Sequence, residues 1–212
     1  EEHLDRSEIG VRTRQVADMI VDRITNISPD FDPDKAESAV VDAFKAAKIK
    51  LEKPKAKKGE ENTGRAVSGY LLFLSNQQIN RLANAIVEAK GEKIPAKEIK
   101  DILDTDHSVD IALFGRMLAD APDFNVDAAC QVAHALGVHG SEPDFDYYTA
   151  VDDVIRESED ETGAGMIGTI EMASSTLYRY ANINVDALKT NLGGSSVATV
   201  EATLAFIRAF ID

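Results

Sequence analysis

Apolar residues recur at the spacing of an α-helix along much of the first 105 residues, and this pattern constrains the fold more than any other feature. The periodic segments are residues 11–24, 33–47, 75–87 and 95–103. A proline opens the second segment and a serine precedes the third, and both residue types are favoured at helix starts. The expected buried stripes are Val11, Val16, Met19, Ile20 and Ile24; Ala36, Ala39, Val40, Ala43, Phe44 and Ala47; and Ile79, Leu82, Ile86 and Val87.

Extended and mixed patterns follow or interrupt these helices. Residues 69–74 and 109–113 are short apolar runs typical of strands, residues 126–138 suit a buried strand or helix, and residues 166–183 are expected to be extended. A closing helix is expected to begin at Ser195 or Ser196. Its expected inward residues are Val197, Val200, Leu204, Ile207 and Ile211. The combined pattern predicts an α+β fold, helical before about residue 105 and mixed after it.

The composition is that of a folded protein outside the membrane. The chain has 212 residues, 44% of them apolar, and no apolar run approaches the roughly 20 residues that span a bilayer. The lone Cys130 excludes an internal disulfide framework and suits a reducing cytoplasm. The chain starts without Met or a signal-peptide pattern, which suggests a fragment of a longer protein.

Charge is distributed unevenly along the chain. The formal net charge of −14 opposes nucleic-acid binding by the surface as a whole, because phosphate contacts come from basic residues. Lysines nevertheless cluster over residues 45–58, and residues 142–161 are strongly acidic. The Lys/Glu-rich stretch near residues 50–65 has almost nothing to bury and predicts a mobile loop.

Three motifs resemble cofactor-binding, metal-binding or catalytic sites, but each lacks the neighbouring structure or ligand spacing that such a site requires. Residues 163–168 match the dinucleotide-binding pattern GxGxxG, with Asp186 about 20 residues later, yet an acidic loop precedes them and the following segment looks extended. A glycine turn is the preferred interpretation. Cys130, His134 and His139 lack the spacing of a four-ligand zinc site.

Adjacent acidic residues offer a third candidate. Asp152 and Asp153 resemble metal-binding carboxylates of a nuclease, but neighbours on a strand point to opposite faces. No cofactor or metal is therefore expected, and the protein is expected not to be an enzyme.

Tyr147, Tyr148 and Thr149 lie together in a polar stretch where packing gives little reason for aromatic residues. Exposed aromatic side chains stack on bases or wedge between them. The alternative is a local hydrophobic anchor for the loop, and composition alone leaves both possibilities open.

Three groups of residues in the second half carry a family resemblance. They are residues 108–117 (SVDIALFGRM) with 125–129 and 133–135; residues 144–153 (DFDYYTAVDD); and residues 168–169, 178–184 (YRYANIN) and 192–194. Their order and spacing resemble the CasC family, the backbone subunit of the type I-E CRISPR Cascade complex. The resemblance covers about residues 108–194.

The resemblance implies a hand-shaped fold, with an incomplete RRM-like (ferredoxin-like) palm, a helical fingers domain and a β-hairpin thumb. The implied domains are fingers over 1–105, a palm segment over 106–140, the thumb over 141–182, and a palm segment with the closing helix over 183–212. Relatives have further palm strands and a basic RNA-gripping segment, which this chain is expected to lack.

The same resemblance implies a non-catalytic subunit that polymerises along crRNA and presents it to target DNA. Expected partners are crRNA, target DNA, other copies of the chain and other Cascade subunits, in the cytoplasm and with no membrane. Implied RNA-binding residues are Arg116, Met117, Tyr147, Tyr148 and Thr149; implied DNA-binding residues are Lys90, Lys93, Lys97 and Lys100. A metal-dependent ribonuclease subunit and a protein-interaction module without nucleic acid are the alternatives.

Overall fold

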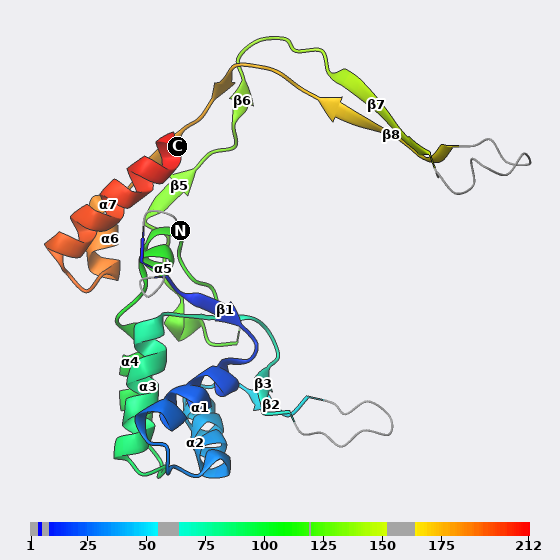
Figure 1. Cartoon of the computed structure of the whole chain (residues 1–212). Coiled ribbons are helices and arrows are strands. Elements are labelled where there is room, and N and C mark those ends of the chain that lie inside the picture. The colour runs from blue at the N-terminus through cyan, green and yellow to red at the C-terminus, as the bar shows by residue number, and fades with distance from the viewer. Residues whose placement is uncertain (1–3, 6–8, 55–63, 119, 152–163) are drawn as a thin grey trace, which may run out of the picture. The chain divides into compact units, whose positions relative to one another are not determined.

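The computed structural model describes residues 4–5, 9–54, 64–118, 120–151 and 164–212 (Figure 1). The chain divides into two compact units. The first comprises Glu1–Gln131 and Asn182–Asp212, and the second comprises Val132–Ala181. Helices and small two-stranded sheets both contribute, so the expected mixture of helix and strand is confirmed at this level.

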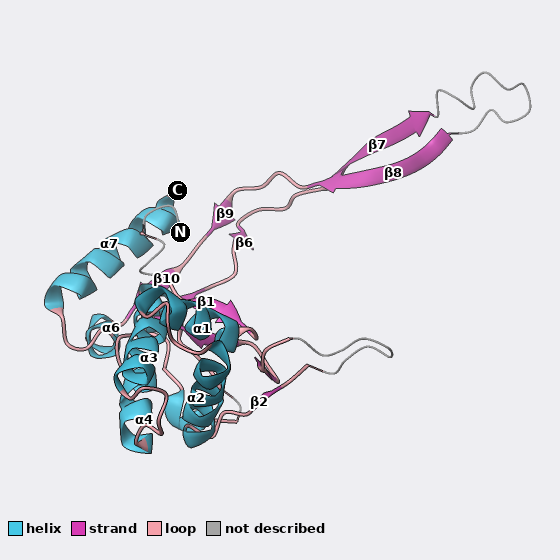
Figure 2. Cartoon of the chain, turned by 60° about the horizontal axis from the view of Figure 1, so that its bottom comes forward, coloured by secondary structure: helices cyan, strands magenta, loops and turns pink. Residues whose placement is uncertain are grey.

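Four helices build the main core of the first unit. They are α1 (Val16–Ile27), α2 (Pro33–Ala46), α3 (Asn76–Glu88) and α4 (Ala96–Asp104). Helix α1 packs against α2 and α3, and α4 packs against the same two helices (Figure 2). The stripes predicted for α2 and α3 are buried, apart from the half-buried Val87. Each large aliphatic or aromatic side chain in this core contributes about 1.5–3 kcal/mol by leaving water.

Side-chain caps fix where two of these helices begin. Asp32 accepts hydrogen bonds from the amides of the next turn of α2, ahead of Pro33. Ser75 and Gln78 form a reciprocal capping box at the start of α3, with Ser75 Oγ accepting from the Gln78 amide at 3.0 Å. The predicted starts of both helices are confirmed.

Two short antiparallel pairs accompany the helices. Strand β1 (Val11–Thr13) pairs with β4 (Leu72–Leu74), and β2 (Leu51–Glu52) pairs with β3 (Val67–Ser68). The helix expected from residue 11 therefore starts five residues later, because residues 11–13 pair with β4. The expected loop near 50–65 is ordered at both ends, and its residues 55–63 lie outside the described part.

The segment expected to be a strand at 109–113 is instead helix α5 (Val109–Phe114). Its hydrogen bonds run along the helix, as from the Ala112 amide to the Ser108 carbonyl. Helix α5 packs against α6 (Val185–Asn191) in a second core cluster that includes Leu113, Cys130 and Leu188. A five-residue apolar run does not distinguish helix from strand, and tertiary packing decided this case.

Helix α7 (Ser196–Ile211) begins after the Ser195 cap as expected but buries a different face. Thr199, Ala202 and Ala205 are buried, so the predicted inward orientation was wrong. The residues expected inside are exposed: Val197, Val200, Leu204, Ile207 and Ile211. Because α7 is apolar around most of its circumference, its sequence pattern does not select one face.

Two strand pairs lie in the second unit. Strand β6 (Leu136–Gly137) pairs with β9 (Leu177–Tyr178), and β7 (Asp144–Val151) pairs with β8 (Ala164–Met172). Strands β5 (Cys130–Val132) and β10 (Ala181–Ile183) form another pair. The extended character expected for 166–183 is confirmed. The burial expected for 126–138 is found only at Ala129 and Cys130; Val126 is half-buried, and residues 127–128 and 131–138 are exposed.

None of the helices in the described ranges is long and apolar enough to cross a membrane.

Candidate nucleic-acid interface

Strands β7 and β8 form an antiparallel pair, called here the β7–β8 ribbon (Figures 1 and 2). Strand β7 carries Tyr147, Tyr148 and Thr149. Tyr147 lies opposite Thr169, and Tyr148 lies opposite Gly168. Successive side chains of a strand point to opposite faces, and directly paired residues share a face. Tyr147 and Thr149 therefore share one face of the ribbon, and Tyr148 lies on the other.

The two faces differ in chemistry. The Tyr147 face is largely aromatic, β-branched and aliphatic, with a single carboxylate. It consists of Phe145, Tyr147, Thr149, Ile167, Thr169 and Glu171. The Tyr148 face carries two carboxylates and thioether side chains. It consists of Asp144, Asp146, Tyr148, Ala150, Met166, Gly168, Ile170 and Met172.

Exposure separates the two tyrosines further. The side chain of Tyr147 is 66% exposed, whereas that of Tyr148 is 39% exposed. A Cβ atom added to Gly168 would lie 2.5 Å from Tyr148 Cζ and 2.9 Å from its Cε1. The Tyr148 ring therefore covers the backbone of Gly168, and the absence of a side chain there makes room for it.

Arg116 and Met117 follow α5 and point in opposite directions. Arg116 forms an isolated antiparallel bridge with Val126, with amide-to-carbonyl distances of 2.9 and 2.8 Å. Gly115 precedes it at φ +78°, close to the carbonyl of Val126. The Arg116 side chain is 4% exposed, whereas Met117 is 81% exposed. This bridge holds the Met117 side chain in solvent.

The Arg116 guanidinium donates hydrogen bonds to backbone carbonyls of the first unit. Its Nε and Nη2 donate to the Phe124 carbonyl at 3.0 and 2.8 Å, and Nη2 also donates to the Leu103 carbonyl at 3.0 Å. Its Nη1 donates to the Phe73 carbonyl at 3.3 Å. Burial lowers the pKa of Arg116 to about 10, which leaves it charged at neutral pH. In this arrangement Arg116 is a structural residue, and its burial opposes the direct RNA contact expected from the sequence.

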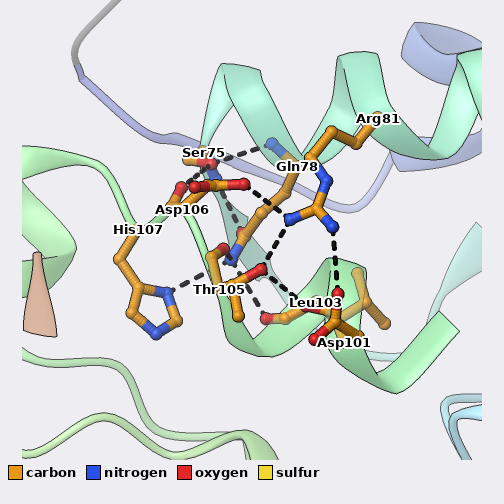
Figure 3. Close-up of polar contacts among 8 residues, drawn as sticks. All are labelled: Ser75, Gln78, Arg81, Asp101, Leu103, Thr105, Asp106 and His107. Atoms are coloured by element: carbon orange, nitrogen blue, oxygen red, sulfur yellow. Dashed lines mark hydrogen bonds and ion pairs between the residues drawn. The ribbon is translucent and has the colours of Figure 1, made fainter. Parts of the chain in front are cut away.

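Gln78 connects this arginine to the loop between α4 and α5, and Figure 3 shows its contacts with Leu103 and Thr105. Its Nε2 donates to the carbonyls of Leu103 and Thr105 at 3.0 and 2.8 Å. Its Oε1 accepts from Arg116 Nη1 at 3.4 Å. The buried amide thus satisfies backbone groups at the end of α4, where intrahelical partners are missing.

The same loop is held on its outer side by Arg81 (Figure 3). Arg81 Nη1 lies 2.6 Å from Thr105 Oγ1 and 2.5 Å from Asp106 Oδ2, and its Nη2 lies 3.0 Å from Asp101 Oδ2. Asp106 has a positive φ of 53°, which non-glycine residues seldom adopt. These bonds stabilise the strained loop.

His107 completes the network as a neutral side chain. Burial lowers its pKa to about 4, and the nearby Arg116 charge acts in the same direction. The distance between Gln78 Nε2 and His107 Nδ1 is 3.2 Å. The spacing of Ser75 and Gln78 was a readable capping signal, whereas nothing in the sequence pointed to Arg116 or His107 as their partners.

The four lysines expected to contact DNA do not share one helical face. Lys90 follows the end of α3 at φ +52°, and Lys93 lies in the connecting turn. Only Lys97 and Lys100 belong to α4, and Lys100 Nζ lies 3.4 Å from Asp123. They do not share a face because α3 ends at Glu88; the side chains of Lys90, Lys93 and Lys97 are exposed.

The motifs rejected from sequence have other roles in the described residues. Residues 164–168 lie within strand β8, so the dinucleotide motif lacks its helix, and the glycine turn expected there is also wrong. His139 uses both ring nitrogens, one with the Gly140 carbonyl at 2.8 Å and one with the Thr176 amide at 3.0 Å. Cys130 is a buried free thiol.

The sequence offers two sets of possible metal ligands: Cys130 with His134 and His139, and Asp152 with Asp153. No group of three or more His, Cys, Asp or Glu side chains that could hold a metal ion occurs among the residues with described positions. Asp152 and Asp153 lie outside those residues.

Together these features define a mixed helix-and-strand protein with a ribbon that exposes aromatic side chains. The chain belongs to the CT1975-like protein family, whose model matches residues 1–212.

Solved structures of CRISPR complexes resemble the chain. One, described as "CRISPR RNA-guided surveillance complex, pre-nicking", contains a chain that is 32% identical at a TM-score of 0.72. The match covers 96% of this chain and 56% of that one. A chain of another "CRISPR RNA-guided surveillance complex" is 28% identical at a TM-score of 0.58, over 95% of this chain and 54% of that one. The chain thus spans little more than half the length of these relatives. No curated protein matches it significantly.

Proposed function

We propose that the chain is part of a crRNA-binding backbone subunit of a CRISPR surveillance complex, of the type I-E Cascade kind. The observation that carries this proposal is the match over nearly the whole chain to a subunit of an RNA-guided complex, at 32% identity. In this role the subunit polymerises along crRNA and presents it to target DNA. Its partners are crRNA, target DNA, other copies of itself and other Cascade subunits, in the cytoplasm.

The β7–β8 ribbon is the proposed thumb, and the helical part of the first unit is the proposed fingers. The incomplete RRM-like palm comprises the remaining segments. Tyr147, Tyr148 and Thr149 are the proposed RNA contacts of the ribbon, because stacking of a base on an aromatic side chain contributes about 1–3 kcal/mol. Since the two tyrosines lie on opposite faces, each is available to a different nucleotide.

Met117 is the proposed RNA contact of the first unit. Its side chain is 81% exposed and is held outward by the bridge at Arg116. An exposed thioether on a rigid backbone can wedge against an unstacked base. Arg116 acts here as a positioning residue and not as an RNA contact.

Assembly on guide RNA tests this function. Full-length protein co-expressed with its complex partners should purify with a small RNA of uniform length and protect it at a regular period. Tyr148→Ala combined with Met117→Ala should weaken assembly on RNA. Tyr180→Ala, an exposed tyrosine outside the ribbon, is the matched control. Unchanged assembly of the double variant would contradict the proposed contacts, and a complex without RNA would contradict the function.

The subunit is proposed to be non-catalytic, with any cleavage by a separate nuclease. The assembled complex, incubated with complementary RNA and Mg²⁺, should leave that RNA intact. Regular cleavage that Asp152→Ala abolishes would instead establish a metal-dependent ribonuclease.

A further inference from the structure

Positive charge accumulates at the C-terminal end of α2, although the whole chain carries −14. Lys45 lies in the last turn of the helix, and Lys48 and Lys50 follow within five residues. All three side chains are exposed, while the intervening Ala47 and Ile49 are buried. This alternation directs the three lysines, called here the α2-end lysines, outward from a fixed backbone.

The described residues form no ion pair with two of these lysines. No carboxylate among the described residues forms an ion pair with Lys45 or Lys48. Lys50 pairs with Glu52, but their side chains are 79% and 64% exposed, so solvent screens this pair and its contribution is small. The charge of the cluster is therefore largely available to an external anion.

Lys53 is close in sequence but differs in its surroundings. It borders a cavity of about 540 Å³ that is also lined by Asp34, Glu37 and Asp42. These carboxylates offset its charge, so Lys53 is not counted with the α2-end lysines.

The backbone of Lys48 is in the left-handed region, with φ +63°. It occupies the position after the helix end, where the Ile49 amide bonds to the Phe44 carbonyl at 2.9 Å. Glycine is the favoured residue at this position because it has no Cβ. The helix dipole favours a cation here, but Lys45 already supplies one in the last turn. A lysine kept in a strained conformation suggests a use for its side chain.

The spacing of the cluster suits a nucleic-acid backbone. One helical turn, about 5 Å, separates Lys45 from Lys48. At most about 7 Å separates the Cα atoms of Lys48 and Lys50, which are two residues apart. Along one strand of a DNA duplex a phosphate occurs every ~3.4 Å of the axis, so lysines spread over this distance can each meet a different phosphate.

We propose that Lys45, Lys48 and Lys50, which are none of the ribbon residues or the lysines of 90–100, contact the phosphodiester backbone of a nucleic acid in the assembled complex. The inference rests on the proposed function. Guide RNA and target DNA share the chemistry that this cluster recognises, and the experiment below distinguishes them.

The test compares complexes assembled from full-length protein with all three lysines replaced by Gln, or all three by Arg. A control with the same charge change carries Gln77→Glu, Asn80→Asp and Asn84→Asp on the exposed face of α3. Two quantities are measured for each complex: the guide RNA bound per subunit, and the affinity for a target duplex at several salt concentrations. Thermal unfolding of each subunit shows whether it remains folded.

The Gln variant is expected to lower the slope of log K against log salt by about 2–3, since each phosphate contact contributes about 0.9 on duplex DNA or 0.7 on a single strand. The Arg variant should keep the wild-type slope. Loss of duplex affinity with normal guide content assigns the contact to DNA, and loss of guide content assigns it to RNA. Wild-type values for both quantities in the Gln variant, or an equal loss in the α3 control, would overturn the proposal. Wild-type complex without any guide RNA would contradict the proposed function instead.

Discussion

The ring of Tyr148 lies across the backbone of Gly168, its direct partner on the neighbouring strand. The glycine leaves room for the ring, and the ring in turn covers a strand position that has no side chain of its own. Tyr147, one residue earlier, lies on the other face and is mostly exposed. The two tyrosines are therefore not equivalent, although they are adjacent in sequence.

Gly168→Ala is expected to displace the Tyr148 ring. The added methyl group would lie 2.5 Å from Tyr148 Cζ, far inside van der Waals contact. We expect changed NMR shifts for the Tyr148 ring and nearly unchanged shifts for Tyr147. A double variant that also carries Tyr148→Ala should tolerate the alanine, because the clash is gone. Unchanged Tyr148 shifts in Gly168→Ala would contradict this packing.

Arg116→Met should destabilise the first unit by about 2–4 kcal/mol, because the carbonyls of Phe124 and Leu103 lose buried donors. Met117→Ala should change the free energy of unfolding by less than about 0.5 kcal/mol, since that side chain is exposed. Urea denaturation measures both. Equal stability of Arg116→Met and wild type would contradict the structural role of Arg116.

His107 should make stability depend on pH between about 6.5 and 4. Its pKa falls from 6.5 to about 4 on folding, so the unfolded chain binds the proton more readily. Stability is therefore retained above pH 6.5 and decreases as the pH falls toward 4, by about 1–2 kcal/mol because solvent screens the partly exposed ring. Carboxylates titrate in the same range, so the measurement is the difference between wild type and His107→Asn, whose side-chain oxygen can replace Nδ1. Parallel stability curves for the two proteins would contradict the neutral histidine.

Lys48→Gly should stabilise the chain by about 1 kcal/mol, because glycine adopts φ +63° without a Cβ penalty. Lys45→Gly, inside the last turn of α2, should destabilise it by a similar amount. Thermal unfolding of both variants tests this contrast. Destabilisation by Lys48→Gly would show that the lysine side chain supports the fold.

The 212-residue chain by itself should bind RNA weakly. Its net charge is −14, and phosphate contacts require local positive charge. Filter binding of a labelled guide RNA measures the affinity. Nanomolar binding at physiological salt would show that the local basic clusters outweigh the overall charge.

The sequence by itself determined the helices that combine a helical spacing of apolar residues with a favourable residue at the N-terminal end. Helices α2 and α3 begin where Pro33 and Ser75 predict, because helix-start preferences depend on residues within one turn. The alternation of strand side chains likewise determined that Tyr147 and Tyr148 face opposite ways once β7 is a strand. The family resemblance also came from the sequence, through the order and spacing of short motifs.

Tertiary packing determined the features that the local sequence pattern leaves ambiguous, such as the choice between helix and strand or the face of a helix that is buried. Residues 109–114 form a helix in which Ile111, Ala112 and Leu113 are all buried, and α7 buries Thr199, Ala202 and Ala205 although a second apolar stripe was available. Arg116 next to Met117 looked like part of an exposed RNA contact, yet carbonyls distant in sequence bind its guanidinium. Burial and long-range hydrogen bonds depend on which segments meet, and the periodicity of one segment carries no information about its partner.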